Sequence, residues 1–315
     1  MSWPVKSLGD LTQISLAIEL NRLKLRAPTL NASGVLGMSV PLLRRVYDSG
    51  VGAVVTKSLG PQARLGHLNP TVVTVEGGIL NAMGLPNPGV NYFIDEIRKL
   101  KSQNIPVIAS FFASTLKEFS ESASSLSEAG SDALELNLSC PNVEGEVGMC
   151  AADALSVERV TAAVKAVTDK PVIVKLSPNV TDIASIAVAA EKGGADAITA
   201  TNTLKAMAID THFKRPVLMN VTGGLSGPAL KPIALRCVWE IFEAVEIPII
   251  GCGGVATGID AVEYILAGAS AVEIGTAVMT HGFEVYGEIN EGIRTYLTEN
   301  GYSKVSELVG GAHHV

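Results

Sequence analysis

Residues 169–203, DKPVIVKLSPNVTDIASIAVAAEKGGADAITATNT, carry the pattern that decides the fold. The apolar runs PVIVKL and ADAIT are typical of short strands, and the apolar residues between them recur at spacings of three and four, which predicts a helix. An X-Pro step precedes the first run and a Gly-Gly pair precedes the second, so each strand follows a helix stop. Because both runs are almost continuously apolar, they fit a parallel sheet that is buried on both faces.

The same alternation continues outward in both directions. Helical patterns occupy residues 156–169, 180–193 and 261–268, and a final helix is expected at about 284–299. Strands two, four, six and eight follow a Gly stop, whereas strands three, five and seven follow an X-Pro step. The expected strands begin near Leu30, Val54, Val107, Leu134, Val172, Ala197, Ile249 and Val272. This order indicates a faint repeat of two strand–helix units.

Eight strands joined by helical crossovers predict an α/β fold, a single (β/α)8 TIM barrel that spans residues 1–315 as one domain. A doubly wound sheet is the alternative. Residues 14–26 alternate like a β-hairpin and are expected to plug the N-terminal face of the barrel. The connections 58–90 and 204–226 are too long for plain turns and leave the C-terminal ends of strands, the face where barrel enzymes carry their active sites.

Composition excludes several classes of function. The 315-residue chain has a formal net charge of −7, so it has no basic field to attract nucleic acid. Its four cysteines form no CxxC pair, which argues against a zinc or iron–sulfur site in this chain. Residues 1–25 lack the pattern of a signal peptide, and no run approaches the roughly 18 apolar residues of a membrane span. We therefore expect a cytoplasmic protein with no metal site and no membrane association.

Glycine-rich turns follow the last two expected strands, as GCGG (251–254) and GT (275–276). Loops at these positions of a barrel often bind a phosphate through backbone amides, and a helix that begins near Gly258 would add a favourable dipole. Either turn alone could be structural, but the pair favours a phosphate site. Two strands also end in lysine, Lys57 and Lys175, whose ammonium either extends to the rim or neutralises an anion.

Carboxamide side chains are concentrated in three connections, NAMGLPNPG (81–89), NLSCPNV (137–143) and TNT (201–203). Each carboxamide offers a donor and an acceptor, which suits a planar ligand rich in amides, and the backbone amides of the first loop could hold a carboxylate. Cys140 could be a nucleophile, a base or an inert packing residue. No HExxH, GxSxG or GxxxxGK[ST] motif occurs, so hydrolase and P-loop functions are disfavoured.

These motifs, together with TGGLSGPALKP, GCGGV and AGASAVEIGT, resemble the class 1 dihydroorotate dehydrogenases in order and spacing, from about Ile14 to Tyr302. The stretch TGGLSGPALKPIAL is most similar to class 1B, whose catalytic subunits pair with a second subunit carrying FAD and a [2Fe–2S] cluster. Class 2 enzymes have a serine base where this chain has Cys140, and they carry a membrane-associating N-terminal extension.

The resemblance implies that the enzyme oxidises (S)-dihydroorotate to orotate in pyrimidine synthesis, with FMN as the first acceptor. Cys140 would take the C5 proton while a hydride passes from C6 to the flavin. Residues expected to hold the substrate are Lys57, Asn81, Ala82, Met83, Gly84, Leu85, Asn137, Asn142, Asn202 and Thr203. Residues expected to hold FMN are Ser33, Lys57, Ser58, Asn137, Lys175, Thr201, Gly227, Gly253, Gly254, Gly275 and Thr276. Lys175 would stabilise the reduced flavin.

Two positions and the electron acceptor are less determined by the resemblance. Ser110 stands where the family usually has an asparagine that contacts the flavin, and no role can be assigned to Cys150. The chain lacks a GxGxxG unit for NAD, so we expect a homodimer that passes electrons to NAD through the partner subunit, as a heterotetramer. The alternatives are a class 1A-like enzyme that uses fumarate and an FMN barrel that reduces another pyrimidine. A tRNA-modifying flavoprotein is disfavoured by the negative charge.

Overall fold

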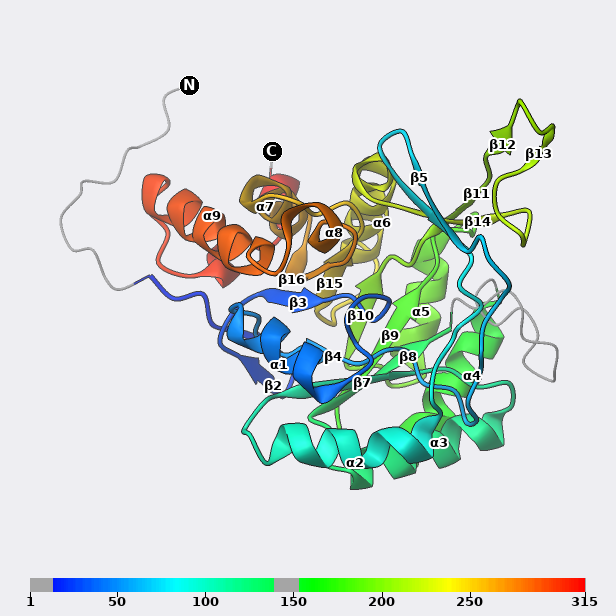
Figure 1. Cartoon of the computed structure of the whole chain (residues 1–315). Coiled ribbons are helices and arrows are strands. Elements are labelled where there is room, and N and C mark those ends of the chain that lie inside the picture. Colours follow the sequence, from blue (N-terminus) through cyan, green and yellow to red (C-terminus); the bar gives the residue numbers. More distant parts are fainter. Residues whose placement is uncertain (1–13, 139–152, 315) are drawn as a thin grey trace.

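The computed structural model describes residues 14–138 and 153–314, which form a barrel of parallel strands surrounded by helices (Figure 1). The barrel sheet has the order β3-β16-β15-β10-β9-β8-β7-β4. Its strands are β3 (Thr29–Asn31), β4 (Val54–Val55), β7 (Val107–Phe111), β8 (Ala133–Asn137), β9 (Val172–Leu176), β10 (Ala197–Ala200), β15 (Ile249–Cys252) and β16 (Ala269–Ile274). The two outer strands of this order also meet, because Leu30 forms a parallel bridge with Ala53 and the Gly52 amide donates to the Thr29 carbonyl over 2.8 Å. The predicted TIM barrel is therefore confirmed, and the doubly wound alternative is wrong because such a sheet stays open.

Helices cover the outside of the barrel in the order that the sequence predicts (Figure 1). They are α1 (Val40–Asp48), α2 (Val90–Lys101), α3 (Leu116–Glu128), α4 (Ala154–Lys165), α5 (Ile183–Lys192), α6 (Lys231–Phe242), α7 (Gly258–Leu266), α8 (Val278–His281) and α9 (Val285–Glu299). Capping residues determine where several of them begin. The Asp182 side chain accepts a hydrogen bond from the Ser185 amide at the start of α5, and Thr257 and Asp260 form a capping box on α7. The Asp182 cap places the start of α5 at Ile183, a few residues after the beginning of the expected range 180–193.

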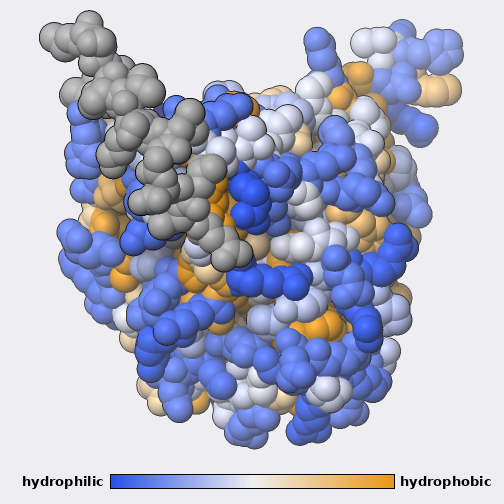
Figure 2. Space-filling model, turned by 90° about the vertical axis from the view of Figure 1, so that its left-hand side faces the viewer, coloured by the Kyte–Doolittle hydropathy of each residue, from blue (hydrophilic) through white to orange (hydrophobic). Residues whose placement is uncertain are grey.

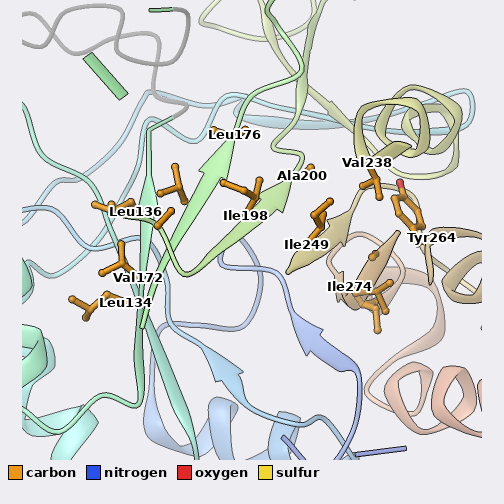
Figure 3. Packing of buried hydrophobic residues seen from close by; sticks show 14 of the residues in the cluster. Leu134, Leu136, Val172, Leu176, Ile198, Ala200, Val238, Ile249, Tyr264 and Ile274 are labelled. Carbon is orange, nitrogen blue, oxygen red and sulfur yellow. The ribbon is translucent and has the colours of Figure 1, made fainter. Parts of the chain in front are cut away.

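Alternation along each strand divides the side chains between two cores. One set, which includes Leu134, Leu136, Val172 and Ile198, lies in the core between the sheet and the helices (Figure 3). The other set points into the barrel. The layer of these side chains that lies nearest the N-terminal end is apolar. Leu20, Leu23 and Leu25 of the hairpin β1 (Ile18–Leu20) and β2 (Leu23–Leu25) pack against Val55, Ile108, Ala133, Ile173, Ala197, Ile250 and Ala271 of that layer. The hairpin thus plugs the N-terminal end of the barrel, as predicted.

The two long connections form a second sheet instead of irregular loops. Residues of the first connection make β5 (Val72–Val75) and β6 (Gly78–Asn81), and the second makes β11 (Leu204–Ala206) and β14 (Gly223–Ser226). These strands pair antiparallel in the order β11-β14-β6-β5. The sheet has a small core of its own around Leu80, Ala82 and Leu218. The short pair β12 (Ile209–Asp210) and β13 (Arg215–Pro216) projects beyond it at the upper right of Figure 1.

The surface on the left of Figure 1 faces the viewer in Figure 2, and its hydrophobic residues occur in small groups among hydrophilic ones. Across residues 14–138 and 153–314, none of the helices combines the length and the apolar character that crossing a membrane requires.

Candidate active site

The expected cofactor and substrate residues lie around one end of the barrel. Lys57 and Ser58 follow β4, Asn137 ends β8, and Thr201 follows β10. Because the barrel strands are parallel, these positions lie at the same C-terminal face. Ser33, Lys175, Gly253, Gly254, Gly275 and Thr276 belong to the same ends of β3, β9, β15 and β16. Cys140, Asn142 and Cys150 lie outside the described residues.

Carboxamides from different strand ends meet at the mouth of the barrel. The Asn137 Nδ2 donates to the Ser58 Oγ over 3.0 Å, and the Asn202 Nδ2 lies 3.4 Å from the Asn137 Oδ1. The Asn202 Oδ1 in turn accepts from the Thr203 amide at 2.7 Å. Residues from three different connections therefore form one hydrogen-bonded group at the mouth of the barrel.

The second sheet brings Asn81 to this group. The Asn81 Nδ2 donates to the Gly224 carbonyl over 3.2 Å. Gly224 packs against Thr203 so closely that a Cβ at this glycine would lie 2.0 Å from the Thr203 Oγ1. A side chain at residue 224 would thus displace Thr203, and the glycine lets the two long connections approach each other over the mouth.

The loop after β6 presents backbone amides in a fixed shape. Within the described part of the chain, the amides of Met83, Gly84 and Leu85 donate no hydrogen bond, whereas the Ala82 amide donates to the Thr71 carbonyl. Gly84 and Leu85 have φ angles of 74° and 55°, so successive N–H groups turn in the left-handed region. Such a run of amides is suited to an anion, as the sequence predicts for a carboxylate.

Asn87 holds this loop in place. Its Oδ1 accepts from the amides of Gly60 and Gly89, both at 2.9 Å, and its Nδ2 donates to the Leu85 carbonyl at 2.9 Å. Sequence analysis did not single out Asn87, although its place between two prolines in LPNPG was a signal that this buried side chain stabilises the turn.

Lys57 is half-buried, and no carboxylate of the described residues forms an ion pair with it. Burial lowers the pKa of its ammonium, because removal from water disfavours the charged form. An ammonium without a counter-charge in the protein is favourable for binding an anionic ligand. This arrangement fits the prediction that Lys57 contacts the ligand.

Lys175 is placed differently. Its side chain is fully inside the barrel, where it forms an ion pair with Glu273, and its Nζ lies 3.7 Å from the Glu135 Oε2. Burial alone would lower the pKa of Lys175, but attraction to Glu135 and Glu273 outweighs burial and raises it. The ammonium therefore does not extend to the rim, and two carboxylates already compensate its charge.

Ser110 connects the mouth to this buried cluster. Its Oγ donates to the Glu135 Oε1 over 2.8 Å and lies 2.9 Å from the Ser58 Oγ, which itself accepts from Asn137. Since the Ser110 hydroxyl has one proton, Ser58 is the donor between the two serines. A chain of hydrogen bonds thus runs from Asn137 through two hydroxyls to the carboxylate of Glu135.

The glycine turns at the other side of the mouth are closely packed. Gly227, Gly253 and Gly254 have φ angles of 99°, 140° and 71°, a region that favours glycine. A Cβ at Gly254 would lie 2.8 Å from the Gly227 carbonyl oxygen. Helix α7 begins nearby at Gly258, as predicted, but the Asp260 carboxylate accepts from the amides of Ala256 and Thr257 at its N-terminus. The backbone amides of the glycine turns are therefore the better candidates for a phosphate.

A buried hydroxyl without a partner lies between these two parts of the site. The Thr201 Oγ1 is inaccessible and has no hydrogen-bond partner among residues 14–138 and 153–314. Buried polar groups are nearly always paired, so this hydroxyl indicates a bound group that supplies the partner. Together with the glycine turns, the residues present fit a cofactor that carries a phosphate and a polar ring.

Comparison with known proteins gives the family. A family model described as dihydroorotate dehydrogenase matches residues 15–297. The chain belongs to the dihydroorotate dehydrogenase family.

Relatives within this family are close. Over 305 residues the chain is 53% identical to the "Dihydroorotate dehydrogenase B (NAD(+)), catalytic subunit" of Pyrococcus furiosus, an alignment that covers 96% of this chain and 100% of the relative. It is 50% identical over 298 residues to the protein of the same name from Methanosarcina mazei, with 94% and 95% covered. The protein of that name from Methanothermobacter thermautotrophicus is 46% identical over 293 residues, with 92% and 96% covered. The resemblance to class 1B catalytic subunits is confirmed.

The two carboxylates inside the barrel, Glu135 and Glu273, were not predicted from the sequence. Glu135 and Glu273 are each a single charged residue in an otherwise apolar strand, in ALELN and AVEIG. The signal was the same one that singled out Lys57 and Lys175, a charge that interrupts a buried run.

Proposed function

We propose that this chain oxidises (S)-dihydroorotate to orotate in pyrimidine biosynthesis and is the catalytic subunit of an NAD-linked enzyme. Membership of the dihydroorotate dehydrogenase family and the names of its relatives support this activity. The observation that carries the proposal is Lys57, a half-buried ammonium without a counter-charge among the described residues, because the substrate is a carboxylate. A pyrimidine without a carboxylate would leave this charge uncompensated.

The flavin of this family is proposed to be FMN, one per chain. When bound, FMN would accept the hydride that leaves C6 of the substrate. Gly227, Gly253, Gly254, Gly275 and Thr276 would hold its phosphate, and Ser33, Lys57, Ser58, Asn137, Lys175 and Thr201 would hold its polar ring and ribityl chain. Support comes from the glycine turns and from the Thr201 hydroxyl, which has no partner among the described residues.

The substrate is held in two ways. Lys57 and the free amides of Met83, Gly84 and Leu85 bind the carboxylate by charge and by directed N–H groups. The pyrimidine ring, with its alternating donors and acceptors, is matched by a set of side chains with both functions. These are Asn81, Asn137, Asn142, Asn202 and Thr203, and Ala82 contributes to the loop that carries the amides.

Cys140 is the proposed base. In the sequence it follows Asn137, the last residue of β8, by three positions, and β8 ends at the mouth of the barrel. The C5 proton of dihydroorotate is α to a carbonyl, and a thiolate can remove it as the C6 hydride leaves. The proton ends on the Cys140 sulfur, the electron pair of the C5–H bond forms the C5=C6 double bond, and the hydride from C6 would carry the electron pair of the C6–H bond to the flavin.

Electrons then leave through a second protein. We propose that the chain forms a homodimer and binds a partner subunit with FAD and a [2Fe–2S] cluster, because its own sequence has no GxGxxG unit to hold NAD. The cytoplasm remains the expected compartment.

Steady-state assays of the purified chain test this assignment. With dihydroorotate, the chain alone should reduce an artificial dye but not NAD, and NAD reduction should appear when the flavin and iron–sulfur subunit is added. No dye reduction would contradict the activity. Robust NAD reduction by the chain alone would contradict the need for a partner, and robust fumarate reduction would favour a class 1A-like enzyme.

A further inference from the structure

The barrel interior has an unusual polar layer directly above its apolar one. Barrel interiors are dominated by branched apolar side chains. Here the inward positions two residues after Ile108, Ala133, Ile173, Ala197, Ile250 and Ala271 are Ser110, Glu135, Lys175, Thr199, Cys252 and Glu273. All six side chains are buried. Placing three ionisable groups of opposite sign in one dry layer costs free energy, so the layer calls for a functional explanation.

The charges of this layer do not cancel when every group is ionised. Glu135 and Glu273 carry two negative charges, and Lys175 carries one positive charge. Lys175 donates to Glu273, and its Nζ lies 3.7 Å from the Glu135 Oε2, so both carboxyl groups face the same cation. With one proton on either carboxyl group the cluster is neutral, and without that proton the cluster has a net charge of −1.

Hydrogen bonds indicate which carboxyl holds the proton. Glu135 accepts hydrogen bonds from Ser110 at 2.8 Å and from Thr199 at 3.3 Å. Donors of this kind stabilise the ionised form. Among the described residues Glu273 accepts from Lys175 and from no hydroxyl, whereas Glu135 faces the same ammonium and has two hydroxyl donors besides. We therefore assign the proton to Glu273.

The pKa values agree with this division. Burial and the neighbouring charge of Glu135 raise the pKa of Glu273 to about 8, whereas attraction to Lys175 and the hydrogen bonds overcome burial and lower the pKa of Glu135. The other titratable groups near Glu273 are Cys252 and Tyr286. Burial raises the pKa of Cys252 to about 12 and also raises that of Tyr286, so neither ionises near neutral pH.

We propose that Glu273 is a positioning residue that acts through Lys175, and that its carboxylate takes up a proton when the bound flavin is reduced. The inference rests on the proposed function, because Lys175 is the residue assigned to the flavin. Hydride transfer gives the flavin two electrons and one proton and adds one negative charge. Glu273 takes its proton from solvent and breaks no other bond, so that the added charge is compensated. The same proton returns to solvent when the flavin is reoxidised.

The consequence is a pH-dependent proton count. Below about pH 7, Glu273 is already neutral in the oxidised enzyme, and reduction takes up one proton per two electrons. Above about pH 8 it is ionised before reduction, and the new charge on the flavin raises its pKa, so the count rises to two. Glu273→Gln keeps the shape of the side chain but cannot ionise, and its count stays at one.

A redox titration of the FMN-loaded chain tests this. Dithionite reduces the flavin in the presence of indicator dyes from pH 6.5 to about pH 9.5, and the slope of the midpoint potential against pH gives the proton count. Wild type and the exposed control Glu299→Gln should change from one to two protons per two electrons, and Glu273→Gln should not. A constant count of one in wild type, or a count of two in Glu273→Gln, would overturn the proposal.

Infrared spectroscopy of the oxidised protein provides a readout that needs no reaction. At pH 7 wild type should show the C=O band of a buried protonated carboxyl, which disappears above about pH 8 and is missing in Glu273→Gln. Absence of the band in wild type would also overturn the proposal, even if the variant did not fold. Because dithionite replaces dihydroorotate, failure of the substrate to reduce the flavin would contradict the proposed function without affecting these two measurements.

Discussion

Lys57 and Lys175 both lie where a barrel strand meets the mouth, yet the protein surrounds their charges in opposite ways. Lys175 is enclosed with Glu135 and Glu273, and attraction to these carboxylates raises its pKa in spite of burial. Lys57 forms no ion pair with a described residue, and burial lowers its pKa. The difference teaches that residue type and strand position do not determine a role. A compensated ammonium is held in place by the protein's own carboxyl groups, whereas an uncompensated one is free to pair with the charge of an anionic ligand.

Replacement of the two lysines by methionine gives the largest expected difference. Lys175→Met leaves two carboxylates facing each other without a cation, and breaking a buried pair in this way costs about 3–5 kcal/mol of unfolding free energy. Lys57→Met loses no ion pair, so its unfolding free energy should be unchanged or slightly higher. Urea denaturation of the flavin-free proteins measures both. Equal losses in the two variants would break the comparison.

Orotate binding should be weakened more by Lys57→Met than by Lys175→Met, the reverse of the order expected for stability. Lys57→Met removes the cation assigned to the carboxylate, and loss of one partner of a buried charge pair is expected to raise the dissociation constant about 100-fold, or about 3 kcal/mol. The matched control is Lys205→Met, which removes an exposed lysine from β11 and should change binding little. Titration of orotate against the FMN-loaded proteins, followed by the flavin spectrum, gives both constants. A small effect at Lys57 would mean that another group binds the carboxylate.

Removal of the C5 proton of dihydroorotate should depend on Cys140 and not on Lys57 or Lys175. Cys140→Ala is expected to keep FMN and to slow flavin reduction by dihydroorotate at least about 100-fold, the low end for a general base. Cys140→Ser should recover part of the rate only at higher pH, because a hydroxyl is a much weaker acid than a thiol. Cys150→Ala is the control and should be nearly silent. Stopped-flow reduction measures all three, and a wild-type rate in Cys140→Ala would refute the assignment.

Glu273 should also affect how the unfolding free energy depends on pH. The pKa of Glu273 is raised from 4.5 to about 8 in the folded protein, so the folded state holds a proton that the unfolded chain releases. Its contribution to stability is therefore complete below about pH 4.5 and is lost as the pH rises through 8. The unfolding free energy should fall less steeply over this range in Glu273→Gln than in Glu299→Gln. Identical slopes from urea denaturation at several pH values would show that Glu273 does not hold the proton.

The sequence predicted the barrel well because its strands are local and strongly patterned. The runs that begin near Val107, Val172 and Ile249 are strands at those positions, and the hairpin within residues 14–26 plugs the expected end. The sheet β11-β14-β6-β5 was not predicted, because pairing between residues 78–81 and 223–226 depends on contacts distant in sequence. Helix starts differed by a few residues because single caps such as Asp182 determine them.

The sequence predicted which residues belong to the site better than it predicted which of them contact each other. Asn137, Asn202 and Ser58 meet as expected from their strand ends. The partners of Lys175 could not be assigned, because a charge inside an apolar strand does not show which strand across the barrel carries its counter-charge. Ser110, which stands where the family usually has asparagine, bonds to Ser58 and Glu135, and only the structure places it between the mouth and the buried cluster.

Anaerobic titration of the yellow, FMN-bound chain with dihydroorotate tests the central claim most directly. The account predicts that the flavin absorbance bleaches in proportion to the substrate added and that one orotate forms per flavin reduced. The lysine comparison predicts in addition that Lys57→Met needs far more substrate than wild type to reach the same bleaching. A flavin that stays oxidised with excess dihydroorotate, while dithionite still reduces it, would contradict the account.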